Sequence, residues 1–471
     1  MNTDSGLSLG VPGQGPAVRA DPAAGHGRAA PRWAVSGRTL LLLACVLFMA
    51  NLVAHFPGVM DNDSRNQYAE AISGHYTDWH PPVMAWLWSL LRLVADGPAP
   101  FLVLHLAVYW LGWVLLADGT RRAGHERAAL LMVLAGAFPP FLYINSHVVK
   151  DVGMAAAWLA ATGLVFWCRV QGRRIPLVIG VVVAALVAYG TLVRGNALFG
   201  LGPLLLYATA PAGWLRSGRL IAATLLAAVL AIPVTQVINR VVFQAQARDA
   251  VNSLFVFDLA GIAAHEHDPG LLEPRATLTS EELATCYTPY WWDSFSPWGP
   301  CGARVHRPDN DHATIGEGLA AQWARTLASH PLAYAIHRLR HFNSSLLFAV
   351  PLKHVRLTPE YRTDNPAFPP MEVFSARDIR LDLLRKNPFM WPVTWLAWGA
   401  VLLAWAGRER PAPAILLARV LAVSALGYSG AYLVIGVATD FRYHYWSEIA
   451  VAAATVAVLP QLAQAWRERS R

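Results

Sequence analysis

Long apolar runs alternate with short polar stretches along most of the chain. Ten of these runs approach the roughly 20 residues that an α-helix needs to cross the hydrocarbon core of a bilayer. We therefore predict ten membrane-spanning helices. They cover residues 39–56, 99–117, 128–145, 152–168, 176–193, 196–211, 219–238, 388–406, 412–436 and 445–463.

An eleventh apolar run, "VMAWLWSLLRLVADG" at residues 83–97, has a different character. It is short for a membrane-spanning helix, and Arg92 interrupts it. We predict an interfacial or re-entrant helix that does not cross the membrane.

Composition supports a polytopic membrane protein. Only 14% of the 471 residues are charged and 55% are hydrophobic, whereas soluble domains carry about a quarter charged residues. The fold class predicted is all-α, with about ten transmembrane helices and an interfacial helix after the first outer loop. A small extracytoplasmic subdomain completes it.

The net charge of +8 does not indicate a nucleic-acid partner, because the arginines fall in short clusters between apolar runs. Cytoplasmic loops collect such clusters. If residues 83–97 do not cross the membrane, every cluster falls on one side, and both termini are cytoplasmic. The clusters are the tail before residue 39, "DGTRRAGHER", "CRVQGRR", "RSGR", "GRERP" and "RERSR".

Four segments follow from this pattern. Residues 1–37, rich in Gly, Ala and Pro, are expected to be a disordered cytoplasmic tail, and the apolar run after it a retained anchor. The other three are an N-terminal transmembrane catalytic module (38–238, first outer loop 57–82), an extracytoplasmic subdomain (239–387), and C-terminal transmembrane helices with a short cytoplasmic tail (388–471).

The predicted topology brings most unusual polar stretches to the outer face. The longest, residues 239–387, exceeds what a structureless connector in a compact protein usually spans. It contains the aromatic segment "YTPYWWDSFSPWGPCG" and a helix-like run at residues 315–348. The outer stretches are 57–82, 145–151, 193–196, 239–387 and 439–446.

Two of the four cysteines, Cys286 and Cys301, lie in this outer segment. Outside the cytoplasm they can form a disulfide. The sequence leaves open whether they are bonded.

Carboxylates follow the first apolar run directly. Asp61 and Asp63 come after "FPGVM", where a carboxylate can deprotonate an acceptor hydroxyl or hold a divalent ion. The simpler reading is a hydrated loop that ends the helix. His80 precedes two prolines that fix the chain as it returns to the interface, and a structural hydrogen bond is its alternative role.

Further charged residues lie at the outer ends of other runs. Asp151 suits a helix N-terminus by capping and dipole alone, but with Lys150 it also offers a second carboxylate and a phosphate contact. Arg194 and Arg442 are disfavoured on the outer face by the positive-inside rule, so both are candidate phosphate ligands. Their alternative role is to reach toward the interface without binding anything.

The first outer loop, "DNDSRNQYAEAISGHYTDWHPP", resembles that of the GT-C superfamily of integral membrane glycosyltransferases. In that superfamily an outward aspartate precedes a Gln- and Tyr-containing helix and a Lys- or His-Pro-Pro sequence. Gln67 and Tyr68 match that helix, and Asp151 matches the acidic residue of the second outer loop. Ser64 stands where many members have Glu, which leaves the base open between Asp61 and Asp63.

The resemblance covers most of the membrane part and implies a set of site residues. The catalytic residues implied are Asp63, Asp61 and Asp151. Those implied for the substrate or the donor phosphate are Lys150, Arg194, Arg442, His80, Gln67, His444 and Tyr445. The aromatic outer segment would stack on sugar rings.

We therefore expect an inverting glycosyltransferase that moves a sugar from a polyprenyl-phosphate donor to an envelope glycan, lipid or protein at the outer face of a bacterial inner membrane. Its partners are this donor, membrane lipids and an unspecified acceptor. The sequence identifies no definite cofactor and leaves open a divalent cation, Mg²⁺ or Mn²⁺, held by Asp63 and Asp151. The alternatives are a transporter or flippase of a lipid-linked sugar, and a non-catalytic assembly protein.

Overall fold

The computed structural model describes residues 35–273, 276–305, 318–350 and 387–470. The chain divides into two units, Met1–Ala34 and Val35–Arg471, and everything below concerns the second. The predicted tail therefore lies outside the described residues, except for its last three positions. The described residues form helices and no strands, with three isolated β-bridges.

Six helices in the described ranges are long and apolar enough to cross a membrane. They coincide with six of the ten predicted runs. Their bounds are α1 Gly37–His55, α4 Ala99–Arg122, α7 Lys150–Val170, α10 Ser217–Val237 with a π-helical extension Ile238–Val242, α18 Pro413–Gly430 with α19 Tyr432–Ile435, and α20 Tyr445–Arg469 with the turn that precedes it.

The other four runs form shorter or broken helices. The predicted continuous helix over 128–145 is instead a pair bent by 46°, because the two prolines at the start of its second half cannot donate backbone hydrogen bonds to the first. Ten crossings thus remain a prediction. The helices are α5 Glu126–Ala135, α6 Pro139–Asn145, α8 Leu177–Leu192, α9 Leu198–Thr209 and α17 Pro392–Arg408.

Burial separates central helices from peripheral ones. Most of α7 and α18 is buried, 89% and 83% of their apolar windows, whereas α1 and α10 are 17% and 11% buried. The outward side chains of α10 include Leu225, Val229 and Leu230, each more than half exposed. A continuous apolar surface of this kind is unfavourable in water and suits lipid.

The first outer loop is anchored to the start of α7. Val59 N donates to Ser146 O at 2.8 Å, and Val148 N donates to Val59 O at 2.9 Å. The loop then forms α2, Asn62–Ser73, which ends at Gly74 in the left-handed conformation (φ 70°). Glycine adopts this conformation without steric cost.

The run at residues 83–97 forms one short helix, α3 Val83–Leu91. Nine residues extend about 14 Å, less than half of the roughly 30 Å hydrocarbon core. This length agrees with the prediction that the run does not cross. Tyr68 of α2 packs on Trp88 of α3 with ring centroids 5.1 Å apart, so the two helices form one unit.

The long outer segment contains its own hydrophobic core, which includes Phe257, Leu283 and Phe295. The predicted run at 315–348 is two helices rather than one, because Pro331 starts the second. Residues 306–317 and 351–386 of the predicted subdomain lie outside the described residues. The helices are α11 Asn252–Glu266, α12 Ser280–Cys286, α13 Gly302–Val305, α14 Leu319–Ser329 and α15 Pro331–Leu346.

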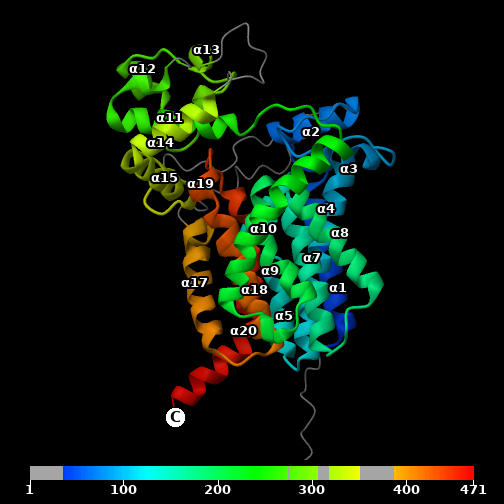
Figure 1. Cartoon of the computed structure of the whole chain (residues 1–471). Helices are drawn as coiled ribbons and strands as arrows, with labels where there is room; N and C mark the ends of the chain where they lie inside the picture. Colours follow the sequence, from blue (N-terminus) through cyan, green and yellow to red (C-terminus); the bar gives the residue numbers. More distant parts are fainter. Residues whose placement is uncertain (1–34, 274–275, 306–317, 351–386, 471) are drawn as a thin grey trace, which may run out of the picture. The chain divides into compact units, whose positions relative to one another are not determined.

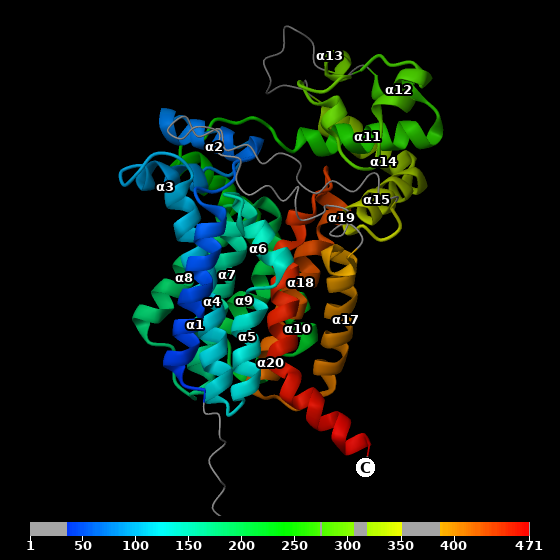
Figure 2. The same ribbon diagram turned by 180° about the vertical axis from the view of Figure 1, so that it is seen from behind.

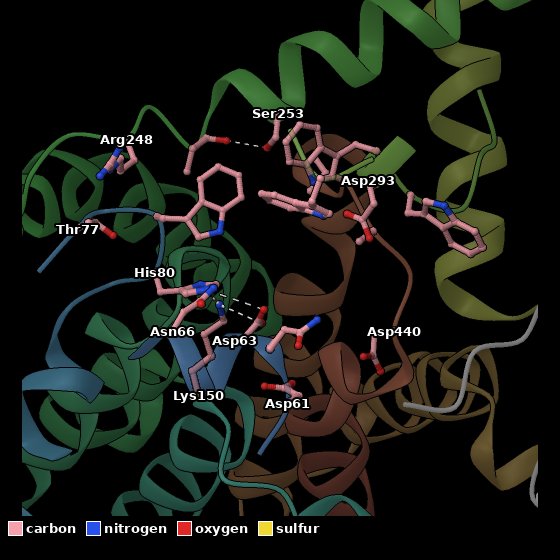
Figure 3. Close-up of a pocket in the computed structure, with 18 of the residues that line it drawn as sticks. Asp61, Asp63, Asn66, Thr77, His80, Lys150, Arg248, Ser253, Asp293 and Asp440 are labelled. Atoms are coloured by element: carbon pink, nitrogen blue, oxygen red, sulfur yellow. Dashed lines mark hydrogen bonds and ion pairs between the residues drawn. The ribbon is translucent and has the colours of Figure 1, made fainter. Parts of the chain in front are cut away.

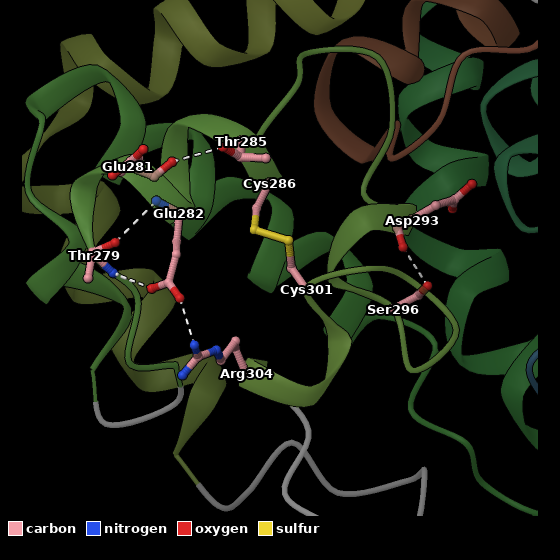
Figure 4. Close-up of a disulfide and its surroundings, with 9 residues drawn as sticks. All are labelled: Thr279, Glu281, Glu282, Thr285, Cys286, Asp293, Ser296, Cys301 and Arg304. Carbon is pink, nitrogen blue, oxygen red and sulfur yellow. Dashed lines mark hydrogen bonds and ion pairs between the residues drawn. A yellow bond between two sulfur atoms is a disulfide. The ribbon is translucent and has the colours of Figure 1, made fainter.

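Cys286 and Cys301, which the sequence left open as a candidate pair, form a disulfide, with the Cα atoms 6.0 Å apart. It closes the aromatic segment into a loop at the end of α12 (Figure 4). The start of α12 is fixed by Thr279 and Glu282, which bond reciprocally to each other's backbone N–H groups. The aromatic loop is thus held at both ends.

The helices α2, α3 and α11–α15 gather at one end of the bundle, and the C-terminus lies at the other (Figures 1 and 2). Among the described residues, the basic clusters lie near the C-terminal end of the bundle. Arg121 pairs with Asp118 at the end of α4, where Gly37 begins α1. Arg169, at the end of α7, donates to Tyr207 O near the end of α9 at 2.6 Å.

Candidate active site

A cavity of about 1420 Å³ opens at the end of the bundle that carries α2 and the outer subdomain (Figure 3). Its walls come from α2, the loop before α3, the start of α7, the segments 248–253 and 291–298, and the segment 437–443. Five of the residues predicted from the sequence line it. They are Asp61, Asp63, His80, Lys150 and Arg442.

Asp61 has a structural role on both of its carboxylate oxygens. Oδ1 caps the N-terminus of α2 by accepting from Ser64 N and Ser64 Oγ, both at 2.8 Å. Oδ2 pairs with Arg442 Nη1. The side chain is only 13% exposed, so this carboxylate fixes the loop that carries its neighbour.

Asp63 lies two positions further along, in the first turn of α2, and lines the cavity, with 29% of its side chain exposed. Its Oδ2 accepts from Arg442 Nη2 at 3.1 Å and lies 3.6 Å from Lys150 Nζ. Burial alone would raise the pKa of Asp63, but the charges of Lys150 and Arg442 hold it well below its usual range. Asp63 is therefore a carboxylate at physiological pH.

His80 connects Lys150 to Asp63. Lys150 Nζ can only donate, so His80 Nδ1 accepts this bond at 2.7 Å and the proton resides on Nε2. Nε2 lies 3.8 Å from Asp63 Oδ1. Burial and the charge of Lys150 lower the pKa of His80 to about 3, although Asp63 opposes them. The imidazole is neutral, and Figure 3 shows the three side chains converging.

Arg442 holds three carboxylates with one guanidinium. Besides Asp61 and Asp63, it pairs through Nε with Asp440 Oδ2 at 3.0 Å, and its backbone N–H donates to Asp440 Oδ1 at 3.2 Å. Burial raises the pKa of Asp440 to about 6, against the lowering effect of Arg442. Asp440 lines the cavity and was not predicted, although it stands two positions before Arg442 in the sequence.

Asp151 and Arg194, also predicted for the site, pair with each other at 2.8 Å in a buried position and do not line the cavity. Arg194 Nη2 also donates to Tyr432 OH at 2.7 Å. Its guanidinium lies over the ring of Tyr443 at 4.4 Å. Since Tyr443 lines the cavity, the pair supports the wall from behind.

Three other predicted residues are buried behind the cavity wall. Gln67 Nε2 donates to a backbone oxygen in the first turn of α2 at 3.1 Å. His444 Nε2 bonds Ser345 Oγ at 2.8 Å, and Tyr445 OH donates to Asn145 Oδ1 at 2.7 Å. They tie α2, α15 and α6 to the site.

Two short backbone pairings hold the outer walls in place. Thr77 pairs with Gln246 in a parallel bridge, and Arg248 N donates to Asp78 Oδ1 at 2.5 Å. On the opposite side Trp292 N donates to Val437 O at 2.8 Å. The outer subdomain is thereby joined to the segment that leads to Asp440 and Arg442.

Aromatic residues line the outer part of the cavity. Trp79 precedes His80, and Trp292 and Trp298 belong to the disulfide-closed loop. The sequence marked that loop by its aromatic density but did not single out these residues. Polar side chains on the same walls are Asn66, Arg248, Asp249 and Asp293.

The surroundings of Asp63 do not fit the divalent ion that the sequence left open. Mg²⁺ and Mn²⁺ take oxygen ligands, whereas the neighbours of Asp63 are Lys150, Arg442 and a neutral imidazole. Asp151, the second predicted ligand, is paired with an arginine. Within the described ranges, no group of three His, Cys, Asp or Glu side chains could hold a metal ion.

Comparison with known proteins adds no identification. Function therefore has to be inferred from the side chains of the cavity. No protein-family model, no curated protein and no solved structure matches the chain.

Proposed function

We propose that this chain is an integral membrane glycosyltransferase of a bacterial inner membrane. It moves a sugar from a polyprenyl-phosphate donor to an acceptor hydroxyl of the cell envelope, with inversion at the anomeric carbon. The observation that carries the proposal is Asp63, 3.6 Å from Lys150 and 3.1 Å from Arg442 at the cavity floor. A proton acceptor and two phosphate-binding cations thus meet at one point.

The position of the basic clusters supports an outward-facing cavity. Clusters of Lys and Arg mark the cytoplasmic side of membrane proteins, and here they lie at the end opposite the cavity. In this orientation both termini are cytoplasmic. Nucleotide sugars are cytoplasmic and do not reach such a site, which favours a donor carried by a lipid.

Lys150 and Arg442 are suited to hold the donor phosphate. Lys150 supplies a compact point charge, and Arg442 a planar fork that matches phosphate oxygens. Both side chains are about nine-tenths buried, where an ionic contact is stronger than in water. Their present partner is Asp63, so an arriving phosphate would share the cations with this carboxylate.

Asp63 is the better candidate for the base. Both oxygens of Asp61 are engaged in the cap of α2 and in the pair with Arg442. Asp63 is the more exposed of the two, and the neighbour of its Oδ1 is a neutral histidine at 3.8 Å. An acceptor hydroxyl can approach this oxygen from the cavity.

In the proposed reaction the acceptor oxygen forms a bond to the anomeric carbon on the face opposite the phosphate. The bond between that carbon and the phosphate oxygen breaks, its electron pair stays on the phosphate, and the acceptor proton passes to Asp63. Lys150 and Arg442 stabilise the charge on the leaving phosphate. Because the phosphate offsets their charge, donor binding raises the pKa of Asp63 and makes it a stronger base.

The test is a transfer assay in membranes with a radiolabelled polyprenyl-phosphate sugar. Loss of a general base typically costs 10²–10⁴-fold in rate, and we expect a loss of about that size for Asp63→Asn. Asp96→Asn is the matched control, because Asp96 is 59% exposed and does not line the cavity. Wild-type transfer by a folded Asp63→Asn variant would show that the proposal is wrong.

A transporter or flippase of a lipid-linked sugar is the second candidate. Glu448 in α20 favours it, because this buried carboxyl has no hydrogen-bond partner among the described residues, and ionisable groups at membrane depth often mark transport paths. Proteoliposomes distinguish the two functions. A transporter moves the lipid-linked sugar across the bilayer without acceptor, and Glu448→Gln stops it while Asp63→Asn does not.

A further inference from the structure

Three tryptophans form a corner in the outer part of the cavity, and we refer to them as the tryptophan corner. The ring centroids of Trp79 and Trp292 are 5.9 Å apart, those of Trp79 and Trp298 5.8 Å, and those of Trp292 and Trp298 5.9 Å. The last two pairs meet edge to face. The rings therefore present faces in different directions rather than one flat stack.

The exposures of Trp292 and Trp298 indicate a binding surface. Trp292 is 5% exposed and packs in the subdomain core, whereas Trp298 is 65% exposed. A large aromatic ring gains little stability from such a position. The loop that carries it is nevertheless closed by a disulfide and by Cys301 N, which donates to Ser294 O at 2.9 Å. An exposed ring on a fixed loop is typical of a recognition element.

The cavity has room for more than the donor head group. At about 1420 Å³ it exceeds the roughly 300–1,000 Å³ of a pocket for one small ligand. The cations that suit the donor phosphate lie at the floor, with Asp63. The tryptophan corner belongs to other wall segments, the loop before α3 and the residues 291–298, and is left for a second molecule.

Polar residues on the outer walls of the cavity narrow the choice of that molecule. The charges of Asp249, Asp293 and Arg248 disfavour an acyl chain, and the two carboxylates offset the attraction of Arg248 for a phosphate. A carbohydrate ring suits both the aromatic faces of the corner and the polar side chains beside it. Its C–H groups carry slight positive charge and suit the electron-rich face of an indole. Its hydroxyls can bond to the carboxylates and to Asn66, which also lines the cavity.

We propose that the tryptophan corner of Trp79, Trp292 and Trp298 is the acceptor subsite and that the acceptor presents a carbohydrate ring there. This inference rests on the proposed glycosyltransferase function. It narrows the acceptor to a glycan or a glycosylated molecule. The ring lies against Trp298 while its hydroxyl reaches toward Asp63.

The test uses saturation-transfer difference NMR on the full chain in detergent micelles. The probes are maltotriose, cellotriose, mannotriose and chitotriose, each added alone. We expect saturation to pass to ring C–H protons of at least one trisaccharide. Trp298→Ala should weaken its binding about 3- to 10-fold, the range expected for one aromatic contact. Trp298 is largely exposed, so this variant keeps its fold, which an unchanged melting temperature verifies.

Two controls separate this inference from the proposed function. Trp214→Ala removes a ring that is 54% exposed but lies outside the cavity, and it should bind the trisaccharide like wild type. Asp63→Asn should also bind it, because the subsite does not need the base. If Asp63→Asn binds normally and also transfers sugar at the wild-type rate, the transferase mechanism fails while carbohydrate binding stands.

The inference itself is overturned if no trisaccharide receives saturation, or if Trp298→Ala binds as tightly as wild type. A tripeptide, Gly-Ser-Gly, and vesicles of phosphatidylglycerol are tested in the same way. Dependence on Trp298 for either of these, with none for the trisaccharides, would assign the corner to a peptide or a lipid and would also overturn it.

Discussion

Arg442 Nη2 donates to Asp63 Oδ2 at 3.1 Å, although 379 positions separate the two residues in the sequence. The contact joins the first outer loop to the turn before the last helix. It thereby closes the floor of the cavity between α2 and the segment that precedes α20. The same guanidinium also pairs with Asp61 and Asp440, so its removal affects three carboxylates at once.

Arg442→Met should destabilise the protein strongly. Removal of one partner from a buried ion pair costs about 3–5 kcal/mol, because the remaining charges are left uncompensated. The melting temperature in detergent measures this effect. Arg92→Met is the control, since Arg92 pairs with Asp96 at an exposed position, where a pair contributes about 0–1 kcal/mol. Equal melting temperatures for the two variants would contradict the role given to Arg442.

Lys150→Met should shift the acid limb of the pH–rate profile to higher pH. Burial raises the pKa of Asp63, and Lys150 has the largest effect among the groups that lower it. Replacing Lys150 with Met therefore raises this pKa. Transfer needs the carboxylate and should then fail at a pH where wild type still works. Lys150→Arg keeps the charge and should keep the limb near its wild-type position. An identical limb in wild type and Lys150→Met would contradict the coupling.

The depressed pKa of Asp63 also determines how the stability of the protein changes with pH. The unfolded side chain titrates near pH 4, above its pKa in the folded protein. The stability that Asp63 contributes is therefore present above about pH 4 and is lost as the pH falls below it. Asp440 behaves in the opposite way, because its pKa in the folded protein is raised.

Asp440→Asn should remove a pH-dependent loss of stability. Burial raises the pKa of Asp440 to about 6, so the native state holds the proton more tightly than the unfolded chain between about pH 4 and pH 6. As the pH rises across that window, the contribution of Asp440 to the wild-type stability falls by roughly 3 kcal/mol. Asn cannot ionise, so the variant lacks this pH dependence. Melting temperatures at pH 4 and pH 7 check this. The same pH dependence in both proteins would contradict the raised pKa.

The sequence indicated much of the cavity floor but not its connections. Asp61, Asp63 and His80 stand close together in one outer loop, and the positive-inside rule made Arg442 unusual. Their contacts depend on how α2 packs against the turn before α20, which periodicity does not report. Asp151 and Arg194 are also charged residues at the outer ends of apolar runs. They nevertheless form an ion pair with each other behind the cavity wall.

The length of a helix could be predicted from the sequence only where the ends of the apolar run are also the ends of the helix. The run at 196–211 is apolar throughout, but α9 is 12 residues long. A 3-10 turn, Gly195–Ala197, precedes it, and Pro211 follows its last turn. The residue before a proline is pushed out of the helical region, and Ala210 is accordingly extended (ψ 151°). Apolarity alone therefore overestimated this span.

Reduction of the disulfide between Cys286 and Cys301 should lower both stability and transfer. The bond closes a loop with a sequence separation of 15, for which the chain-entropy model gives about 3 kcal/mol. The loop also carries Trp292, whose backbone pairs with Val437 beside the site. Thiol labelling should find both cysteines protected before reduction and reactive after it. The Cys286→Ser/Cys301→Ser variant should have a lower melting temperature, whereas Cys45→Ser should not.

Gly299→Ala should displace the exposed ring of the tryptophan corner and leave the side chains at the cavity floor in place. A Cβ at this position would lie 2.0 Å from Asp293 O and 2.6 Å from Ser294 O, so the loop has to move, and Trp298 is its immediate neighbour. We expect the KM for the acceptor to rise several-fold while the KM for the donor stays unchanged, because Lys150 and Arg442 keep their places. Gly213→Ala, where a Cβ meets open space, is the control. A rise in the donor KM alone would show that the loop serves the lipid-borne sugar and that the subsite is misassigned.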